Sequence, residues 1–337
     1  MNAVPKSGAR PVAGMEACTS STKAVIILPG PRCAERHPQA RTGTGYPIMS
    51  AAKNLLFVLS IKKYSVSMST LHPVTTDDGS LSLHSDEYGQ AMHTLSGAYT
   101  EALVKHLRPS GVLARDYRLL RVLDVGFGIG YNVLALLSEF VRDDRNRHLE
   151  IVTLEKEPPP VDLLKRIAFP GETGGLYETI KRLCMDEEVG GETYTMRMLV
   201  GDARKSVRGL EATRFHAIFH DPYSPAKNPE LWTVDFFREL YRVADEGCTL
   251  TTYSSAPRVR AALLEAGFIV GRAPSMGRKR EGTLAAKGTG IEPLGEDELA
   301  ALQGDPKATP YRDETLSAVR EEILSRRKDD MAARRNP

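Results

Sequence analysis

The 337-residue chain has little cysteine, a single tryptophan and no long apolar run. Its cysteines, at positions 18, 33, 184 and 248, form no CxxC pair and have no histidine at metal-ligand spacing. We therefore expect reduced thiols in a cytoplasmic protein, with no zinc or other metal site. The apolar runs reach only five residues, as in Leu55–Leu59. This is far shorter than the roughly 20 residues of a membrane-spanning helix, so no membrane association is expected.

Acidic residues are scarce at the N-terminus. Residues 1–67 contain nine Lys and Arg but two Asp and Glu, and show no helical or strand period. This stretch is a disordered tail, a targeting segment, or spurious upstream sequence translated from a misplaced start codon. We favour the third, because Met68 opens directly into patterned sequence. The remaining chain is mildly acidic, so a nucleic-acid partner would need a local basic patch.

From about residue 74 the chain alternates short apolar runs with helical periods. Strands are predicted at 80–83, 121–125, 149–154, 196–200, 215–219, 248–253, 268–270 and 283–286. Helices are predicted at 87–107, 132–141, 229–244 and 257–266. This alternation predicts an α/β domain over 68–287, with a parallel sheet covered by helices on both faces. Residues 157–193 are expected to cross the active face, and 288–337 to form a charged tail with a helix around 312–328.

A glycine-rich loop, Asp124-Val125-Gly126-Phe127-Gly128-Ile129-Gly130, follows a predicted strand and opens a predicted helix. Gly126, Gly128 and Gly130 permit a sharp turn and let a ligand approach backbone N–H groups. A dinucleotide site prefers G-x-G-x-x-G, and a P-loop needs Gly-Lys-Ser/Thr. The loop, with Asp124 before the first glycine, resembles instead the S-adenosylmethionine motif; a bare strand-turn-helix corner is the weaker alternative. That resemblance implies a Rossmann-like, seven-stranded methyltransferase sheet whose last strand is antiparallel.

Two further acids follow the next predicted strands. Glu155 ends the second strand and is expected to hold ribose hydroxyls; the alternative is a surface acid at a strand end. Asp202 follows the third strand. It is expected to accept a hydrogen bond from an adenine amino group, to cap a helix, or to do both.

The fourth strand leads into Asp221-Pro222-Tyr223, which resembles the acceptor loop of methyltransferases that modify amino groups. Ligands bind outside the carboxyl ends of strands in such sheets, so this loop should face the transferred methyl group. Asp221 is expected to contact the donor and to orient an amine rather than to deprotonate it, because an unperturbed Asp has a pKa of about 3.9. Tyr223 would stack on a base, and Lys227 would meet a phosphate or the donor. A plain Asp-Pro turn is the alternative.

Several motifs together resemble one family. They are Gly126–Asn132, Leu154–Lys156, Asp221–Thr233, Thr252–Ala256 and Gly277–Glu281. The family is the methyltransferase half of the bacterial bifunctional tRNA 5-methylaminomethyl-2-thiouridine biosynthesis proteins, and the resemblance covers about residues 75–287. It implies methyl transfer from S-adenosylmethionine to the aminomethyl group of a wobble uridine in the anticodon stem-loop of tRNA. The family's flavin-dependent oxidase domain has no counterpart here, so no FAD is expected.

This resemblance leaves some questions open. Pro222 and Tyr223 stand where the family often has Gly and Phe, a departure that keeps the aromatic ring. Arg278, Lys279 and Arg280 are predicted to contact phosphates, with Arg258, Arg260 and Arg272 nearby in sequence; the alternative is a solvated positive face. Methyl transfer to another nucleobase or small amine, and a non-catalytic RNA-binding module, remain alternatives. The oligomeric state is not predicted.

Overall fold

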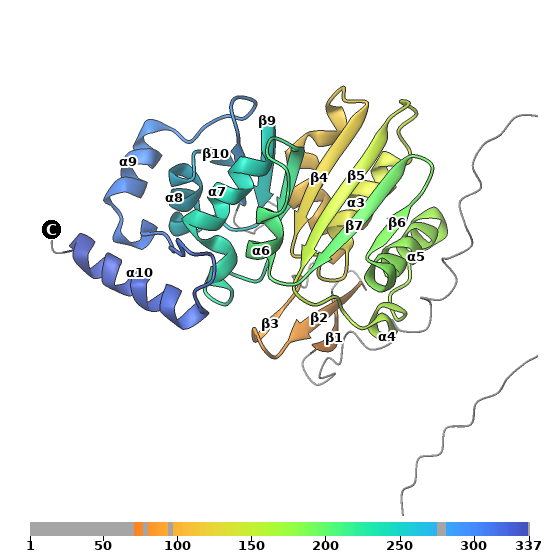
Figure 1. The fold of residues 1–337 in the computed structure, drawn as a ribbon, viewed down its shortest axis with the longest axis horizontal. Helices are drawn as coiled ribbons and strands as arrows, with labels where there is room; N and C mark the ends of the chain where they lie inside the picture. Colours follow the sequence, from red (N-terminus) through yellow and green to blue (C-terminus); the bar gives the residue numbers. More distant parts are fainter. Residues whose placement is uncertain (1–70, 77–79, 94–96, 275–280, 336–337) are drawn as a thin grey trace, which may run out of the picture. The chain divides into compact units, whose positions relative to one another are not determined.

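The computed structural model describes residues 71–76, 80–93, 97–274 and 281–335. Eight strands form the central sheet in the order β10-β11-β9-β8-β4-β5-β7-β6 (Figure 1). Their bounds are β4 Leu119–Val125, β5 His148–Glu155, β6 Glu188–Gly190, β7 Tyr194–Val200, β8 Phe215–His220, β9 Ala244–Thr252, β10 Ile269–Arg272 and β11 Thr283–Ala286. The five central strands are parallel and β11 runs antiparallel between β9 and β10. The predicted Rossmann-like, seven-stranded sheet is confirmed, and β6 adds an antiparallel edge strand.

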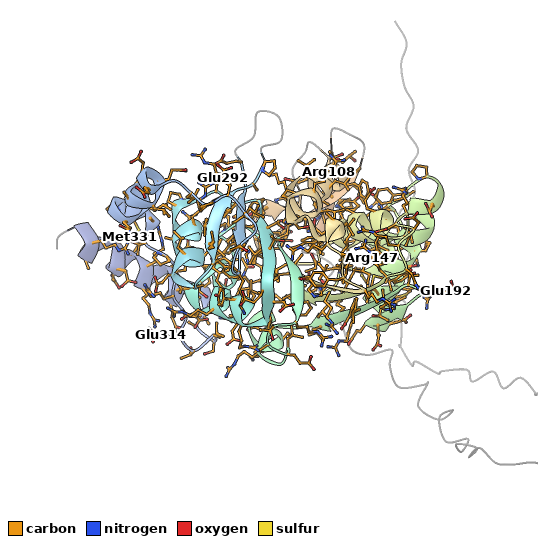
Figure 2. The ribbon with its side chains drawn as sticks, turned by 90° about the horizontal axis from the view of Figure 1, so that it is seen from above. Arg108, Arg147, Glu192, Glu292, Glu314 and Met331 are labelled. Atoms are coloured by element: carbon orange, nitrogen blue, oxygen red, sulfur yellow. The ribbon has the colours of Figure 1, made fainter. Side chains whose placement is uncertain are left out.

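Side chains alternate between the two faces of the sheet, as a pleated strand requires. In β4, Val122 joins one hydrophobic cluster, whereas Leu123 and Val125 join the other. Side chains fill the space on both sides of the sheet (Figure 2). The helices over the first face are α1 Ala98–Ala102, the π-helical η1 Leu103–Leu107, α3 Tyr131–Phe140 and α5 Gly171–Asp186. Those over the second face are α6 Ala203–Arg208, α7 Val234–Val243 and α8 Pro257–Glu265.

The helix predicted over 87–107 is wrong in its first half. The chain instead forms a small separate sheet of β1 Leu71–Thr75, β2 Leu81–Ser85 and β3 Gln90–Ala91. Gly89 has a φ of 55° between β2 and β3, so it makes a turn where the apolar spacing had indicated a helix. Regular helix begins at Ala98.

The connection over 157–193 follows the prediction only at its start, where Glu157, Pro158 and Pro160 line a cavity at the carboxyl ends of the strands. It contains α4 Val161–Leu164, then α5 and β6, and α5 packs on α3 rather than crossing the active face. Tyr177 and Ile180 of α5 are buried in the core, and the Tyr177 hydroxyl donates to the Ile129 carbonyl. The helix was not predicted because glycines and charged residues surround these two buried side chains and leave no regular apolar spacing.

Residues 288–335 are a packed part of the same compact unit, not a tail. They form α9 Glu296–Gly304, η4 Pro306–Ala308 and α10 Arg320–Arg335. Tyr311, Leu316 and Ile323 bury their side chains in the second cluster. Three widely spaced apolar residues give no regular period, which is why the sequence did not predict this packing. Among the described helices, none is long and apolar enough to cross a membrane.

Gly130 and Gly175 provide a matched test of this packing. A Cβ at Gly130 would lie 2.5 Å from Ile180 Cγ2 and 2.8 Å from Phe127 Cζ, at a φ of 83°. A Cβ at Gly175 in α5 would meet nothing within 4 Å. We predict that Gly130→Ala lowers the free energy of unfolding by about 2–4 kcal/mol, and that Gly175→Ala raises it by about 0.5–1 kcal/mol. Urea denaturation measures both; equal effects would contradict the observed α3–α5 contact.

Asp124 is a buried acid within β4. The residue is only 1% exposed, and its Oδ2 accepts a hydrogen bond from Thr153 Oγ1 at 2.7 Å. Oδ1 has no hydrogen-bond partner among the described residues. Burial raises the pKa of Asp124 to about 7, although the Thr153 hydrogen bond lowers it. The folded protein therefore holds a proton here that the unfolded chain releases near pH 4.

This raised pKa predicts a pH-dependent stability. The contribution of protonated Asp124 is complete below about pH 4 and is lost as the pH rises to about 7. Between pH 5 and 7.5, wild type should lose about 1–3 kcal/mol more unfolding free energy than Asp124→Asn. Urea titrations at both pH values measure this difference, in which the effects of other titrating groups cancel. Parallel losses in the two proteins would show that Asp124 is ionised throughout.

Candidate active site

A cavity of about 660 Å³ lies at the carboxyl ends of the parallel strands, with residues of the β2–β3 hairpin in its wall. The loops after β4, β7 and β8 and the end of β5 each contribute to its lining, because parallel strands bring their carboxyl ends to one edge of the sheet. The structure thereby brings together six predicted site residues from four separate parts of the chain. They are Gly126, Gly128, Glu155, Asp202, Asp221 and Tyr223.

Glu155 lies at the end of β5 and faces the glycine loop. Its Oε2 accepts a hydrogen bond from the Gly128 backbone N–H at 3.0 Å, and its Oε1 accepts one from Glu157 N–H at 3.1 Å. Burial raises the pKa of Glu155, while these backbone hydrogen bonds lower it. A carboxylate has about four acceptor positions, so each oxygen retains capacity for a further donor such as a hydroxyl.

Gly126 lies where the glycine loop contacts the loop that carries Asp221. A Cβ at this position would lie 2.9 Å from the Asp221 carbonyl oxygen, and the residue has a φ of 88°. The Asp221 backbone N–H donates to the Val125 carbonyl at 2.9 Å. Glycine is thus required here because the acceptor loop packs directly on the glycine loop, a reason that the motif alone did not reveal.

Two of the predicted donor contacts do not line the cavity. Asp124 lies buried in β4, and Gly130 precedes α3 against Phe127 and Ile180. The prediction that these two residues contact a ligand directly is therefore not supported by the cavity. Their positions instead shape the loop that does line it.

Asp202 caps α6 and lines the cavity. Its Oδ1 accepts a hydrogen bond from the Arg204 backbone N–H at 3.0 Å, so the predicted capping role is confirmed. The Arg204 guanidinium also binds the Asp202 carboxylate through two nitrogens. Burial would raise the pKa of Asp202, but these contacts with Arg204 lower it below its usual value.

Asp221 presents a carboxylate to the cavity, with its side chain 19% exposed. Oδ2 accepts a hydrogen bond from Asn132 Nδ2 at 2.9 Å and lies 3.6 Å from His106 Nε2. Burial by itself would raise the pKa of Asp221, but the interactions with His106, His93 and Asn132 lower it below the usual range. Asp221 is therefore an ionised acceptor of hydrogen bonds and a weak base.

Tyr223 stacks on Tyr88 from the β2–β3 hairpin, with ring centroids 4.1 Å apart. Both rings line the cavity. The Tyr223 carbonyl accepts a hydrogen bond from the indole N–H of Trp232, and the Pro222 carbonyl accepts one from Tyr253. Trp232 is fully buried. The loop that carries Asp221 is therefore fixed through its backbone as well as by its side chains.

Only part of the predicted basic cluster lies within the described residues. Arg278, Lys279 and Arg280 lie outside the described residues. Arg260 is 9% exposed and binds Glu281, while Arg272 pairs with Glu281 and Glu298. Both guanidinium groups are paired with carboxylates, so the interpretation of them as part of a phosphate-binding patch is not supported. Lys227 lies near Gly89 in the hairpin and is not among the residues that line the cavity.

Sequence reasoning missed Asn132, His106 and Tyr88. Asn132 is in the first turn of the helix after the glycine loop, a position whose polar side chain could have been noted. His106 is a buried polar residue in a largely apolar helical segment, and its contact with Asp221 spans 115 positions of sequence. Tyr88 was assigned to a helix rather than to the hairpin. Among the described residues, no three His, Cys, Asp or Glu side chains form a metal-binding group.

Comparisons with known proteins agree with this geometry. A family model described as S-adenosyl-L-methionine-dependent methyltransferase matches residues 175–288. The chain is 31% identical over 261 residues to an uncharacterized protein of Methanocaldococcus jannaschii, covering 76% of this chain and 71% of that protein. The crystal structure of MNMC2 from Aquifex aeolicus has a TM-score of 0.72 and 36% identity, and covers 80% of this chain and 88% of that one.

Larger relatives match as well. The chain is 34% identical over 218 residues to the tRNA 5-methylaminomethyl-2-thiouridine biosynthesis bifunctional protein MnmC of Burkholderia vietnamiensis, covering 60% of this chain. It spans about a third of the length of that bifunctional relative. The shared sheet, the loops at its carboxyl edge and these similarities lead to one conclusion: the chain belongs to the MnmC-type family of S-adenosylmethionine-dependent methyltransferases.

Proposed function

We propose that the protein transfers a methyl group from S-adenosylmethionine to the aminomethyl group of 5-aminomethyl-uridine, with or without 2-thiolation, at the wobble position of tRNA. The observation that carries this proposal is the ionised Asp221 carboxylate, held in the cavity wall beside the glycine loop by Asn132 and His106. The bifunctional relatives named for tRNA biosynthesis support the choice of acceptor.

The cavity fits the methyl donor in size and in its polar groups. Its volume lies within the roughly 300–1,000 Å³ of small-molecule sites. Glu155 would accept hydrogen bonds from the ribose hydroxyls, Asp202 from the adenine amino group, and Gly126 and Gly128 would allow close backbone approach. When bound, S-adenosylmethionine supplies an electrophilic methyl group on a sulfonium.

Asp221 suits an amine acceptor. Its carboxylate would accept an N–H hydrogen bond and so hold the nitrogen lone pair toward the donor. The nitrogen would gain the methyl group as the bond from the methyl carbon to the donor sulfur breaks, so S-adenosylhomocysteine leaves. One proton would pass from the nitrogen to water, and the product is a secondary amine. Tyr223 would pack against the uracil ring on the side away from Tyr88, since Tyr88 already covers one face. We further propose that Lys227, Arg278, Lys279 and Arg280 contact tRNA phosphates.

Asp221→Asn tests the acceptor role. Removal of the negative charge leaves the shape of the cavity intact but loses the preferred N–H acceptor. We predict that kcat falls by about 100-fold or more, while the Kd for S-adenosylmethionine changes by less than about 3-fold. The measurements are transfer of labelled methyl to tRNA that carries 5-aminomethyl-2-thiouridine, and calorimetry for donor binding.

The control for this experiment is Asp162→Asn, which changes an exposed acid of α4 paired with Lys165. It should leave both constants unchanged. Wild-type activity in Asp221→Asn would reject the proposed role of this carboxylate. Transfer to small amines or to another nucleoside, with none to the wobble uridine, would replace the proposed acceptor. Donor binding without transfer to any acceptor would favour a binding module.

Replacement of Arg278, Lys279 and Arg280 by alanine tests the phosphate contacts. We predict weaker tRNA binding, and a salt dependence of log Kd reduced by about 0.7–0.9 for each phosphate that the variant no longer neutralises. Donor affinity should not change. Fluorescence anisotropy from about 50 to 200 mM salt measures this slope. Arg118→Ala with Arg142→Ala removes two exposed charges next to the amino end of β4 and the end of α3, and should leave the slope unchanged.

A further inference from the structure

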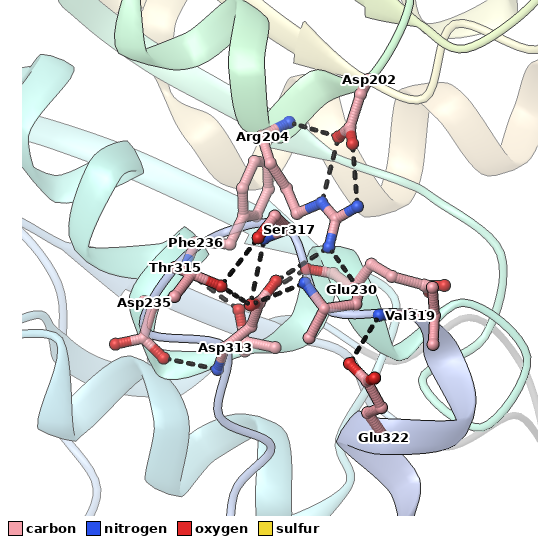
Figure 3. Close-up of polar contacts among 12 residues, drawn as sticks. Asp202, Arg204, Glu230, Asp235, Phe236, Asp313, Thr315, Ser317, Val319 and Glu322 are labelled. Carbon is pink, nitrogen blue, oxygen red and sulfur yellow. Dashed lines mark hydrogen bonds and ion pairs between the residues drawn. The ribbon is translucent and has the colours of Figure 1, made fainter.

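Arg204 connects the cavity to the C-terminal segment (Figure 3). Its Nε and Nη2 bind Asp202 Oδ1 and Oδ2 at 3.1 and 2.8 Å. On the other side, Nη1 donates to Asp313 Oδ2 and to the Ala318 carbonyl, each at 2.8 Å. One guanidinium thus joins a carboxylate that lines the cavity to a segment more than 100 residues later in the chain.

Asp313 is the fixed end of this connection. Its side chain is 0% exposed, and its Oδ1 accepts hydrogen bonds from Thr315 Oγ1 and from the backbone N–H groups of Ser317 and Ala318. Its own N–H donates to Asp235 in α7. A buried carboxylate with this many partners has one position, and Arg204 is the cation that neutralises it.

Asp202 is the partly exposed end of this connection. Its side chain is 30% exposed, at the cavity. Oδ1 accepts from both the backbone N–H and the Nε of Arg204, whereas Oδ2 accepts from Nη2 alone among the described residues. A carboxylate oxygen has two lone pairs, so Oδ2 retains one acceptor position, and Arg204 determines its direction. A planar guanidinium bound at two points fixes the plane of its carboxylate partner.

The same C-terminal segment supports the acceptor loop. The Tyr311 carbonyl accepts a hydrogen bond from the Val234 N–H, next to η3 Pro229–Trp232. Arg320 donates to the carbonyl of Ala226 at 3.3 Å, and α10 packs on η3. The segment from Tyr311 to Arg320 therefore contacts both the loop that carries Asp221 and the arginine that holds Asp202.

From these contacts we propose that Asp313 and Arg204 are positioning residues for the methyl donor: the C-terminal segment directs the free lone pair of Asp202 toward an amino group on the purine of the ligand. The inference rests on the proposed donor role of Asp202. It assigns to residues 311–320 a part in purine recognition, in addition to their packing in the core.

The test is a double-mutant cycle on donor affinity in the full chain. Asp313→Asn removes the charge that anchors Arg204, and we expect the Kd for S-adenosylmethionine, measured by calorimetry, to rise about 5-fold or more. Because Asp313 acts through Asp202, the double variant Asp202→Ala/Asp313→Asn should bind no more weakly than Asp202→Ala alone. In assays, the KM for the donor should rise while kcat at saturating donor is unchanged.

A second measurement follows purine recognition directly. S-inosylhomocysteine lacks the exocyclic amino group of S-adenosylhomocysteine, so wild type should prefer the adenosyl compound and Asp313→Asn should lose most of that preference. Arg204→Lys keeps the charge but cannot bind two carboxylates through a planar guanidinium. It should therefore lose the adenosyl preference as Asp313→Asn does. It serves as the test variant if Asp313→Asn does not fold. Glu314→Gln, an exposed neighbour at the edge of the molecule (Figure 2), should match wild type.

Additive losses in the cycle, or an unchanged adenosyl preference in Asp313→Asn and Arg204→Lys, would overturn the proposal and leave Asp313 a residue of the core alone. The outcome is separable from the choice of acceptor, because donor binding needs no tRNA. An Asp202→Ala variant that binds the donor as well as wild type would reject the role of Asp202 and this inference with it. Failure to methylate tRNA, with the cycle as expected, would affect the proposed acceptor only.

Discussion

The backbone contact between Gly126 and Asp221 sets the geometry on which the site depends. The parallel pairing of β4 and β8 ends with the Asp221 N–H donating to the Val125 carbonyl, and the next residue is a glycine because any side chain would meet the Asp221 carbonyl. The loop that turns into α3 and the loop that presents Asp221 are therefore in van der Waals contact. In an enzyme that moves a methyl group from donor to acceptor, this contact brings the two binding regions within reach of each other.

Two acids near this contact have pKa values shifted in opposite directions. Asp124 and Asp221 are both deeply placed at the ends of adjacent strands, but their polar partners differ. Asp124 receives one hydrogen bond, from Thr153, and its pKa rises to about 7. Asp221 has Asn132 and His106, and its pKa is lowered. Close carboxylates disfavour joint ionisation, so a protonated Asp124 permits the charge to reside on Asp221, which faces the cavity.

The cavity wall is assembled from segments that the sequence separates widely. The hairpin contributes Tyr88, the central strands contribute Glu155 and Asp221, and the C-terminal segment acts through Arg204. Asp313 is the clearest case, since it is fully buried, lies far from any motif and binds the arginine that also binds Asp202. Such a residue reveals itself only through its partners, because an isolated Asp in a charged stretch is ordinarily solvated.

The sequence by itself determined the parallel sheet and the loops at its carboxyl edge, because buried strands and glycine turns depend on local composition and spacing. Those signals led to Gly126, Glu155, Asp202 and Asp221, which line one cavity; their contacts with a ligand stay predictions. The antiparallel last strand was expected from the family resemblance alone. Only the tertiary structure decided which polar groups meet: Asn132 and His106 at Asp221, Tyr88 on Tyr223, and Arg204 between Asp202 and Asp313. These pairings depend on how distant segments pack, and spacing along the chain does not predict such packing.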